Sequence, residues 1–152
     1  MESTKHIVIS LIISVLLFGC VAQQPLIKQT QSGYPEGLFR NADLETIRSK
    51  IINGCASYGL MVIESSPNQV ICGTTMKGGN AVLAQMAIGN SYSTTPQRKI
   101  RFTIYKIETN VKVTAQEWIE TQMAFGQVQT SELKSNNQIN SVQNFLFALG
   151  AE

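Results

Sequence analysis

The sequence predicts an α+β fold, a two-layer sandwich in which an antiparallel sheet of about four strands carries two helices on one face. Apolar residues recur at three- and four-residue spacing near both ends of the region 40–152, which is typical of amphipathic helices. Between these two segments lie four β-rich runs, grouped in pairs around short polar turns. The predicted order is therefore α-β-β-insertion-β-β-α, in a single domain over residues 40–152.

A short N-terminus that carries Lys5 precedes an apolar run over Ile7–Cys20. This run is shorter than the roughly 20 residues needed to span a bilayer. A basic start, a short apolar centre and a small residue before the cleavage point are typical of a signal peptide. We therefore predict that residues 1–19 are a lipoprotein signal peptide. An ordinary signal peptide and an uncleaved anchor helix are the alternatives.

The end of this run, Leu17-Phe18-Gly19-Cys20, resembles the lipobox of bacterial lipoproteins, with Phe18 at a place where a small residue is usual. The resemblance implies that Cys20 becomes the lipid-bearing first residue of the mature protein, held to a membrane by its acyl chains. Val21, and not Asp, follows the cysteine. That implies the outer membrane of a Gram-negative cell. We expect the domain on the periplasmic face of this membrane; the cell surface is the alternative.

Residues 20–39 are predicted to form a lipidated polar tether. They are rich in glutamine, and Pro25 and Pro35 interrupt any regular pattern. A tether of this kind behaves as a flexible chain, so it would let the domain reach away from the membrane surface.

The first helix is predicted to have Asn41 as its N-cap, with Asp43 and Glu45 in its first turn. Gly59 is placed to end the helix in a left-handed conformation. The apolar stripe of this helix consists of Leu44, Ile47, Ile51, Cys55 and Tyr58.

Two β-rich runs, 60–64 and 69–74, are predicted to form a hairpin that turns at Pro67-Asn68. The next segment, Gly78–Gly89, is rich in alanine, leucine and methionine, and its middle predicts a short apolar helix. One interpretation is an insertion folded back on the domain. The other is an exposed element that contacts a partner or the membrane.

Residues 98–107 alternate between apolar and polar side chains, as does the run 111–121, and a turn at Thr109-Asn110 joins them in a second hairpin. A short further strand is expected at Gln127–Gln129. The last helix is predicted to begin near Ser135 and to end at Gly150. Its apolar stripe consists of Ile139, Val142, Leu146 and Leu149, flanked by Phe145.

This order of elements, behind a lipid anchor and a polar tether, is similar to the helix-grip domains of the C-type lipoprotein of the outer-membrane β-barrel assembly machine. The resemblance implies that the partner of this protein is a protein of the cell envelope. Other small two-layer α+β sandwiches share the same order of elements.

Cys55 lies at the centre of the first apolar stripe, and Cys72 lies in the strand over which that helix is expected to pack. Export places both cysteines in an oxidising compartment, where disulfides form and persist. We therefore predict a disulfide between Cys55 and Cys72; the alternative is two buried free thiols. No Cys-x-x-Cys pair is present, which disfavours redox catalysis.

The sequence after residue 19 contains no histidine and a single aspartate, Asp43, which excludes Ser-His-Asp triads and most zinc sites. Glu117 and Glu120 flank Trp118, but on a strand their side chains would face opposite sides. We therefore expect no catalytic residues, no metal site and no cofactor. A hydrolase that uses these two carboxylates is the weakest alternative.

The net charge of +2 is far below that of a nucleic-acid-binding domain, so no nucleic-acid partner is expected. Arg98, Lys99 and Arg101 form a modest basic patch at the start of the third strand. This patch would contact anionic lipid head groups or an acidic partner. The alternative, which the pattern favours, is a solvated strand face with charges that protect an edge.

Together these features predict a non-enzymatic periplasmic lipoprotein that acts as an interaction or accessory module of a cell-envelope assembly. The alternative is a binding module for a small apolar or lipidic ligand, held between the sheet and the last helix. The excess of apolar residues in the middle of Gly78–Gly89 is the reason for considering such a ligand.

Overall fold

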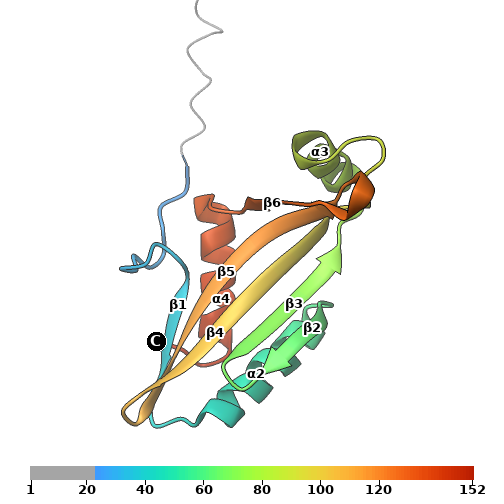
Figure 1. The fold of residues 1–152 in the computed structure, drawn as a ribbon. Helices are drawn as coiled ribbons and strands as arrows, with labels where there is room; N and C mark the ends of the chain where they lie inside the picture. Colours follow the sequence, from blue (N-terminus) through green and yellow to red (C-terminus); the bar gives the residue numbers. More distant parts are fainter. Residues whose placement is uncertain (1–22) are drawn as a thin grey trace, which may run out of the picture.

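The structure is a computed structural model that describes residues 23–152. The predicted signal peptide and Cys20 lie outside these residues. The described chain has an α+β fold, with a six-stranded antiparallel sheet and three α-helices (Figure 1). The fold class is therefore as predicted, whereas the numbers of strands and helices are larger than the four and two that were expected.

The four predicted strands form the main part of the sheet. Two long strands, β4 (Gln97–Ile107) and β5 (Asn110–Gln122), make a hairpin. β3 (Gln69–Thr75) pairs with β4, and β2 (Met61–Ser66) pairs with β3 and forms one edge. Both predicted hairpins are thus present, and the strand ends lie within two residues of the predicted ones.

Two further short strands share the other side of β5. β1 (Glu36–Phe39) pairs with the first half of β5, and β6 (Val128–Glu132) pairs with its second half. β6 falls where a short strand was expected, but β1 falls within the segment predicted to be a tether. β1 has only four residues, too few for an alternation of apolar and polar side chains to indicate a strand. Pro35 and Gly37 also favour a turn there.

The first helix, α2 (Leu44–Ser57), begins two residues later than predicted. Its N-cap is Asp43, whose Oδ1 accepts a hydrogen bond of 2.9 Å from the backbone N–H of Thr46. Asn41, the predicted N-cap, lies in the preceding turn with a φ of 47°. At the other end Gly59 has a φ of 70°, the left-handed conformation that was predicted for it.

The last helix, α4 (Asn136–Ala148), begins where the sequence predicts. Ser135 is its N-cap and forms a capping box with Gln138, in which each side chain bonds the backbone N–H of the other residue. Gly150 follows the helix with a φ of 96°. The buried side chains of α4 are Val142, Phe145 and Leu146, together with two polar residues, Asn140 and Gln143.

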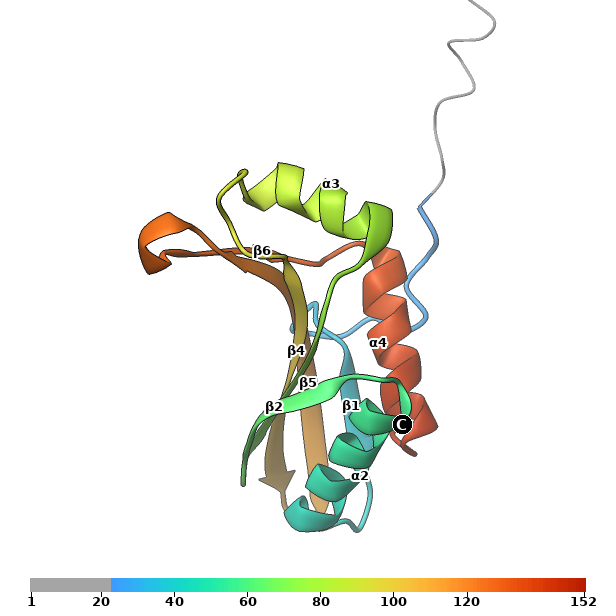
Figure 2. The same cartoon turned by 90° about the vertical axis from the view of Figure 1, so that its right-hand side faces the viewer.

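The segment between β3 and β4 contains the third helix, α3 (Gly78–Ile88), which lies across one end of the sheet (Figure 2). Of its side chains only that of Ala84 is buried. Val82, Leu83 and Met86 are exposed to solvent. The segment is therefore exposed and is not folded onto the core; its contact with a partner or the membrane stays a prediction.

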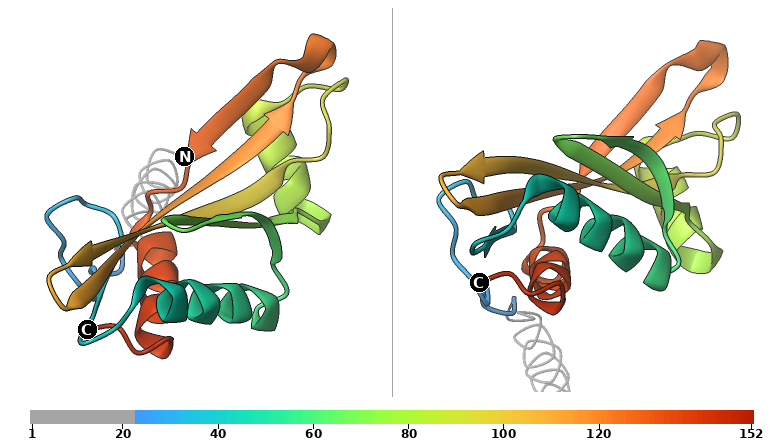
Figure 3. Two further views of the ribbon diagram at one scale, coloured as in Figure 1. Left: turned by 60° about the horizontal axis from the view of Figure 1, so that its bottom comes forward. Right: turned by 90° about the horizontal axis from the view of Figure 1, so that it is seen from below.

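Among the described residues, α2 and α4 lie on one face of the sheet, and the other face carries no helix (Figure 3). Paired residues of neighbouring strands share a face, so the buried side chains form continuous rows under the two helices. Val70, for example, pairs with Phe102, and both are fully buried. Phe102 in turn contacts Phe145 of α4, with ring centroids 5.3 Å apart.

The residues before β1 pack along α4. The Asn136 side chain donates a hydrogen bond of 2.6 Å to the carbonyl of Gln24. Asn140 accepts one of 2.9 Å from the N–H of Ile27 and donates one of 2.8 Å to the carbonyl of Pro25. From residue 24 onward the structure therefore differs from the predicted flexible tether, because α4 binds the backbone of this segment.

Candidate functional surfaces

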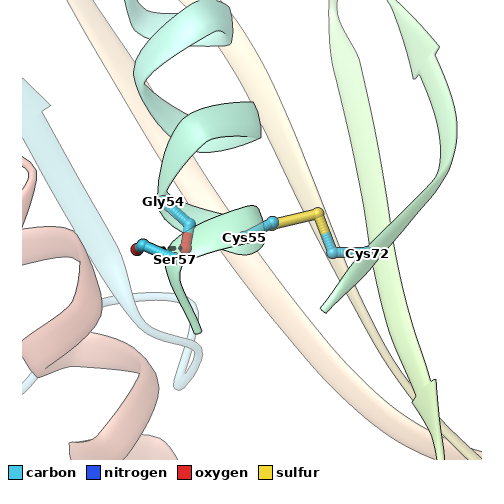
Figure 4. Close-up of a disulfide and its surroundings, with 4 residues drawn as sticks. All are labelled: Gly54, Cys55, Ser57 and Cys72. Carbon is cyan, nitrogen blue, oxygen red and sulfur yellow. Dashed lines mark hydrogen bonds between the residues drawn. A yellow bond between two sulfur atoms is a disulfide. The ribbon is translucent and has the colours of Figure 1, made fainter. Parts of the chain in front are cut away.

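Cys55 and Cys72 are joined by a disulfide, as predicted from their positions (Figure 4). The bond links α2 to β3 and so holds the helix layer to the sheet, with the two Cα atoms 6.3 Å apart. Neither residue has any exposed surface. Because thiol exchange requires access to a sulfur atom, the bond is placed to stabilise the fold.

Strand alternation divides the predicted basic patch between the two faces of the sheet. Arg98 lies on the face that carries the helices, together with the buried Ile100 and Phe102. Lys99 and Arg101 lie on the opposite, outer face. The three cations therefore belong to two separate sites instead of one patch.

The outer face carries a group of side chains that we call the Trp118 cluster: Lys99, Arg101, Trp118 and Glu120. The Glu120 carboxylate pairs with the Lys99 ammonium and accepts a hydrogen bond of 2.9 Å from Nε1 of Trp118. Burial raises the pKa of Glu120, but these two hydrogen bonds outweigh burial, so its pKa lies below the ordinary value. The Arg101 guanidinium lies over the Trp118 ring, 5.2 Å from the ring centroid.

One donor of the Trp118 cluster is unused within the described part of the chain. Nε of Arg101 is buried and has no hydrogen-bond partner there. A buried donor without an acceptor costs free energy. A shallow hollow of about 310 Å³ lies beside it, lined by Arg101, Gln116, Trp118, Glu120, Thr130 and Glu132.

On the helix side of the sheet, Arg98 forms an ion pair with Glu117 of β5. The Glu117 side chain is only 3% exposed, and its Oε2 has no partner among residues 23–152. Burial raises the pKa of Glu117, and the pair with Arg98 offsets only part of this rise. Glu120 lies on the opposite face, as predicted, so the sheet separates the two carboxylates of the hydrolase hypothesis.

An open groove of about 660 Å³ lies between α3 and the beginning of α4; we call it the α3 groove. Its α3 wall is mainly apolar, its α4 wall is polar, and Arg98 lies between them. A groove with one apolar and one polar wall suits an elongated amphipathic ligand. The apolar side chains of α3 that line it are Leu83, Ala84, Ala87 and Ile88. The polar side chains at the start of α4 are Ser135, Asn137, Gln138 and Ser141.

A smaller cavity of about 130 Å³ lies between the sheet and α4, where the alternative hypothesis expects a small apolar or lipidic ligand. Ligand pockets usually measure about 300–1,000 Å³, so this space is too small for an acyl lipid. Arg98 and Ser141 line both this cavity and the α3 groove, which places the two spaces side by side. The groove is therefore the more suitable place for such a ligand.

Sequence reasoning missed the α3 groove and the Trp118 cluster for different reasons. The groove depends on where α3 lies relative to α4, and no local pattern encodes that placement. The cluster depends on the register of the second hairpin, which sets Lys99 directly opposite Trp118. A tryptophan and an arginine on the solvated face of one predicted hairpin were the available signal.

Residues 23–152 contain no group of three His, Cys, Asp or Glu side chains placed to hold a metal ion. Within the same range, none of the helices has both the length and the apolar character needed to cross a membrane.

No protein-family model, curated protein or solved structure matches this chain. Its function therefore has to be inferred from its own residues and their geometry.

Proposed function

We propose that this protein is a non-enzymatic lipoprotein, anchored in the outer membrane through Cys20, that acts as an interaction module of a periplasmic envelope assembly. The observation that carries the interaction role is the Trp118 cluster on the outer face of the sheet. Its Arg101 holds a buried, unused donor beside a shallow hollow, and that face carries no helix among the described residues.

The composition of the Trp118 cluster supports a protein partner. Tryptophan and arginine are the residues most enriched at the energetic centres of protein interfaces. The ring of Trp118 holds the Arg101 guanidinium in place, and an ordered side chain loses less entropy on binding. A carboxylate or a backbone carbonyl of the partner would bind the Arg101 guanidinium from the hollow, so the partner surface is expected to be acidic or an exposed strand.

The partner can be sought by cross-linking in intact cells, followed by identification of the proteins coupled to this one. We expect Arg101→Ala to weaken the complex by tenfold or more, since loss of a central interface residue typically costs above about 1.4 kcal/mol. Thr103→Ala is the matched control, because Thr103 lies on the same strand and face, is exposed and is outside the hollow. If Arg101→Ala recovers the same partner in the same yield as the unchanged protein, the Trp118 cluster does not bind that partner.

The anchor is tested separately from the partner. Radiolabelled palmitate should be incorporated into the unchanged protein and be lost with Cys20→Ala, and globomycin should block processing. A protein that carries no label would refute the lipoprotein assignment, whatever the cross-linking shows.

The α3 groove favours a second candidate function, the binding of a small apolar or lipidic ligand. Its volume of about 660 Å³ lies within the usual range of ligand pockets, and its two walls differ in polarity. Native mass spectrometry of protein purified from cells should then show a bound small molecule. Ala87→Trp, which fills the groove, should abolish this species, whereas Met86→Trp, at the exposed position next to it, should not.

A further inference from the structure

We propose that one end of this molecule lies in the surface of the lipid bilayer that holds Cys20. The apolar end, as we call it, consists of residues 78–97, which include α3, and residues 121–131, which include the β5–β6 turn. The proposal rests on the lipidation of Cys20 proposed above. It adds an orientation and a second, non-covalent contact with lipid.

The two segments of the apolar end are joined to each other. The N–H of Thr94 donates a hydrogen bond of 2.8 Å to the carbonyl of Gln122, and the Thr121 hydroxyl donates one of 2.6 Å to the carbonyl of Thr94. The loop after α3 is thereby fixed to the end of β5. Both views of the ribbon show α3 and the β5–β6 turn at the same end of the molecule (Figures 1 and 2).

Large apolar side chains are concentrated at this end and point into solvent. A helix that is apolar on all sides is normally buried, yet α3 leaves such side chains uncovered. Soluble surfaces seldom carry a contiguous apolar patch without a function. The most exposed side chains of this end are Val82, Leu83, Met86, Tyr92, Phe125 and Val128.

Phe125 is the most unusual of these residues. It is completely exposed at the tip of the β5–β6 turn, and its φ of 68° lies in the left-handed region that bulky residues avoid. Among residues 23–152, no contact compensates for the strain or the exposure of this side chain. Insertion of the ring into a lipid surface would bury it, which gives this conformation a reason.

The apolar end carries no charge. Residues 78–97 and 121–131 contain no Asp, Glu, Lys or Arg. A charged group is costly to remove from water, so the absence of charge lowers the cost of placing this end in the interfacial region of a bilayer. The charges nearest to it in sequence lie just outside the two segments: Lys77 and Arg98 flank the first, and Glu120 and Glu132 flank the second.

The position of the anchor indicates that lipid, and not another protein, covers the apolar end. Gln24 is bound by Asn136, at the start of α4 and across the α3 groove from α3. Cys20 precedes Gln24 by four residues, which span at most about 14 Å even when fully extended. Acyl chains on Cys20 would therefore hold the start of α4, and the apolar end beside it, within a short distance of the bilayer.

The test measures whether α3 contacts acyl chains in the full-length, membrane-purified protein. Met86→Trp is made in a Trp118→Phe background, which removes the native fluorophore, and is reconstituted into phosphatidylethanolamine–phosphatidylglycerol vesicles with brominated acyl chains. Ile107→Trp in the same background is the control. Ile107 is also an exposed apolar residue, but the β4–β5 turn lies at the opposite end of the molecule (Figure 1).

We expect the bromine to quench the emission at position 86 several-fold and the emission at position 107 not at all. Equal, weak quenching at the two positions in an acylated protein would overturn the proposal and leave the lipoprotein assignment intact. A blue-shifted but unquenched emission at position 86 would also overturn it, because α3 would then be covered by protein, such as a second copy of the chain. Intact mass shows whether Cys20 is acylated, and an unacylated protein would refute both the anchor and the orientation built on it.

Discussion

Glu117 stands at a core position of β5 because strand alternation places it on the same face as Val113 and Ala115. A carboxylate there is retained because Arg98 neutralises it from the neighbouring strand. The pairing compensates only part of the desolvation, which raises the pKa of Glu117. At this scale the residue type alone says little, and the neighbours decide the protonation state.

The raised pKa predicts how Glu117→Gln changes stability with pH. The unfolded carboxyl titrates near 4.5 and the folded one above it, so the unchanged protein loses stability as the pH rises through this interval. Glutamine does not titrate. Urea unfolding should therefore show the variant gaining stability relative to the unchanged protein from about pH 4.5 upward, with a constant difference once Glu117 is fully ionised.

Glu120→Gln is the matched control and should give the opposite sign. The folded pKa of Glu120 lies below its ordinary value, so ionisation of this carboxylate contributes stability as the pH rises towards 4.5. The Gln variant should lose stability relative to the unchanged protein over that lower interval. A pH-independent difference for Glu117→Gln would contradict the assignment of a raised pKa.

At the scale of elements, α4 does more than cover the sheet. Two of its buried residues are polar, and both bind the backbone of the N-terminal segment. Gln143 accepts a hydrogen bond of 3.0 Å from the N–H of Glu36 and donates one of 2.8 Å to its carbonyl, which holds the start of β1. Asn140 binds Ile27 and Pro25 in the same way. Through these residues α4 positions the chain that leads to Cys20.

Asn140→Ala is expected to release residues 24–28 without unfolding the domain. The change leaves two partly buried backbone groups without partners, which costs about 1–3 kcal/mol locally. Trypsin should then cleave after Lys28 about tenfold faster or more. Asn144→Ala is the control, since Asn144 lies one turn further along α4 and is exposed. Equal cleavage rates in the two variants would show that Asn140 does not hold this segment.

The disulfide between α2 and β3 also acts at this scale. It joins residues 17 apart, and closing a loop of that size contributes about 3 kcal/mol to stability. Reduction should therefore lower the free energy of unfolding by about that amount in a urea titration. The double variant Cys55→Ala with Cys72→Ala is expected to be insensitive to the reductant; a similar response in that variant would point to an effect unrelated to this bond.

At the scale of the whole molecule, the surfaces have different chemistry. The outer face of the sheet carries charged and aromatic side chains, whereas the end that contains α3 is apolar and uncharged. The N-terminal segment leaves the domain next to this apolar end. In the proposed orientation the membrane covers the apolar end, and the Trp118 cluster stays free for a partner.

Acid should destabilise the whole domain. Burial raises the pKa of Glu36, but hydrogen bonds from Lys112 and Ser32 outweigh burial and lower it; Glu120 behaves alike. Because these folded pKa values lie below 4.5, the stability that the carboxylates contribute is lost as the pH falls through them. At pH values below about 4.5 the urea concentration at the unfolding midpoint should decrease. The decrease should be smaller in Glu36→Gln, which lacks one of these carboxylates. A midpoint unchanged down to pH 3 would contradict this expectation.

Much of the fold could be predicted because its signals are local. The caps at Ser135 and Gly59, the alternation in β4 and β5 and the turn at Pro67-Asn68 each depend on a few neighbouring residues. Errors arose where distant residues decide. Asn41 and Asp43 both suit the N-cap role, and the fold places Asp43 there; β1 is a strand only because β5 offers an edge.

The candidate sites divide in the same way. The cysteine pair could be predicted because a helical stripe and a strand pattern each mark one buried position. The basic patch was predicted wrongly. The three residues are close in sequence, but strand alternation places Arg98 on one face of the sheet and Lys99 and Arg101 on the other. The polar contacts of Asn140 and Gln143 also have no local signal, since their partners lie more than a hundred residues away.

By itself the sequence determined the α+β class, both hairpins, the first and last helices and the disulfide, because hydrophobic periodicity, caps and turns act over a few residues. Only the tertiary structure decided that α3 is exposed and that residues 24–39 belong to the fold. It also decided that Arg98 lies on one face of the sheet and Lys99 and Arg101 on the other. These features depend on register and on contacts between distant segments. Such contacts form only when the sheet brings the segments together, and no short stretch of sequence carries that information.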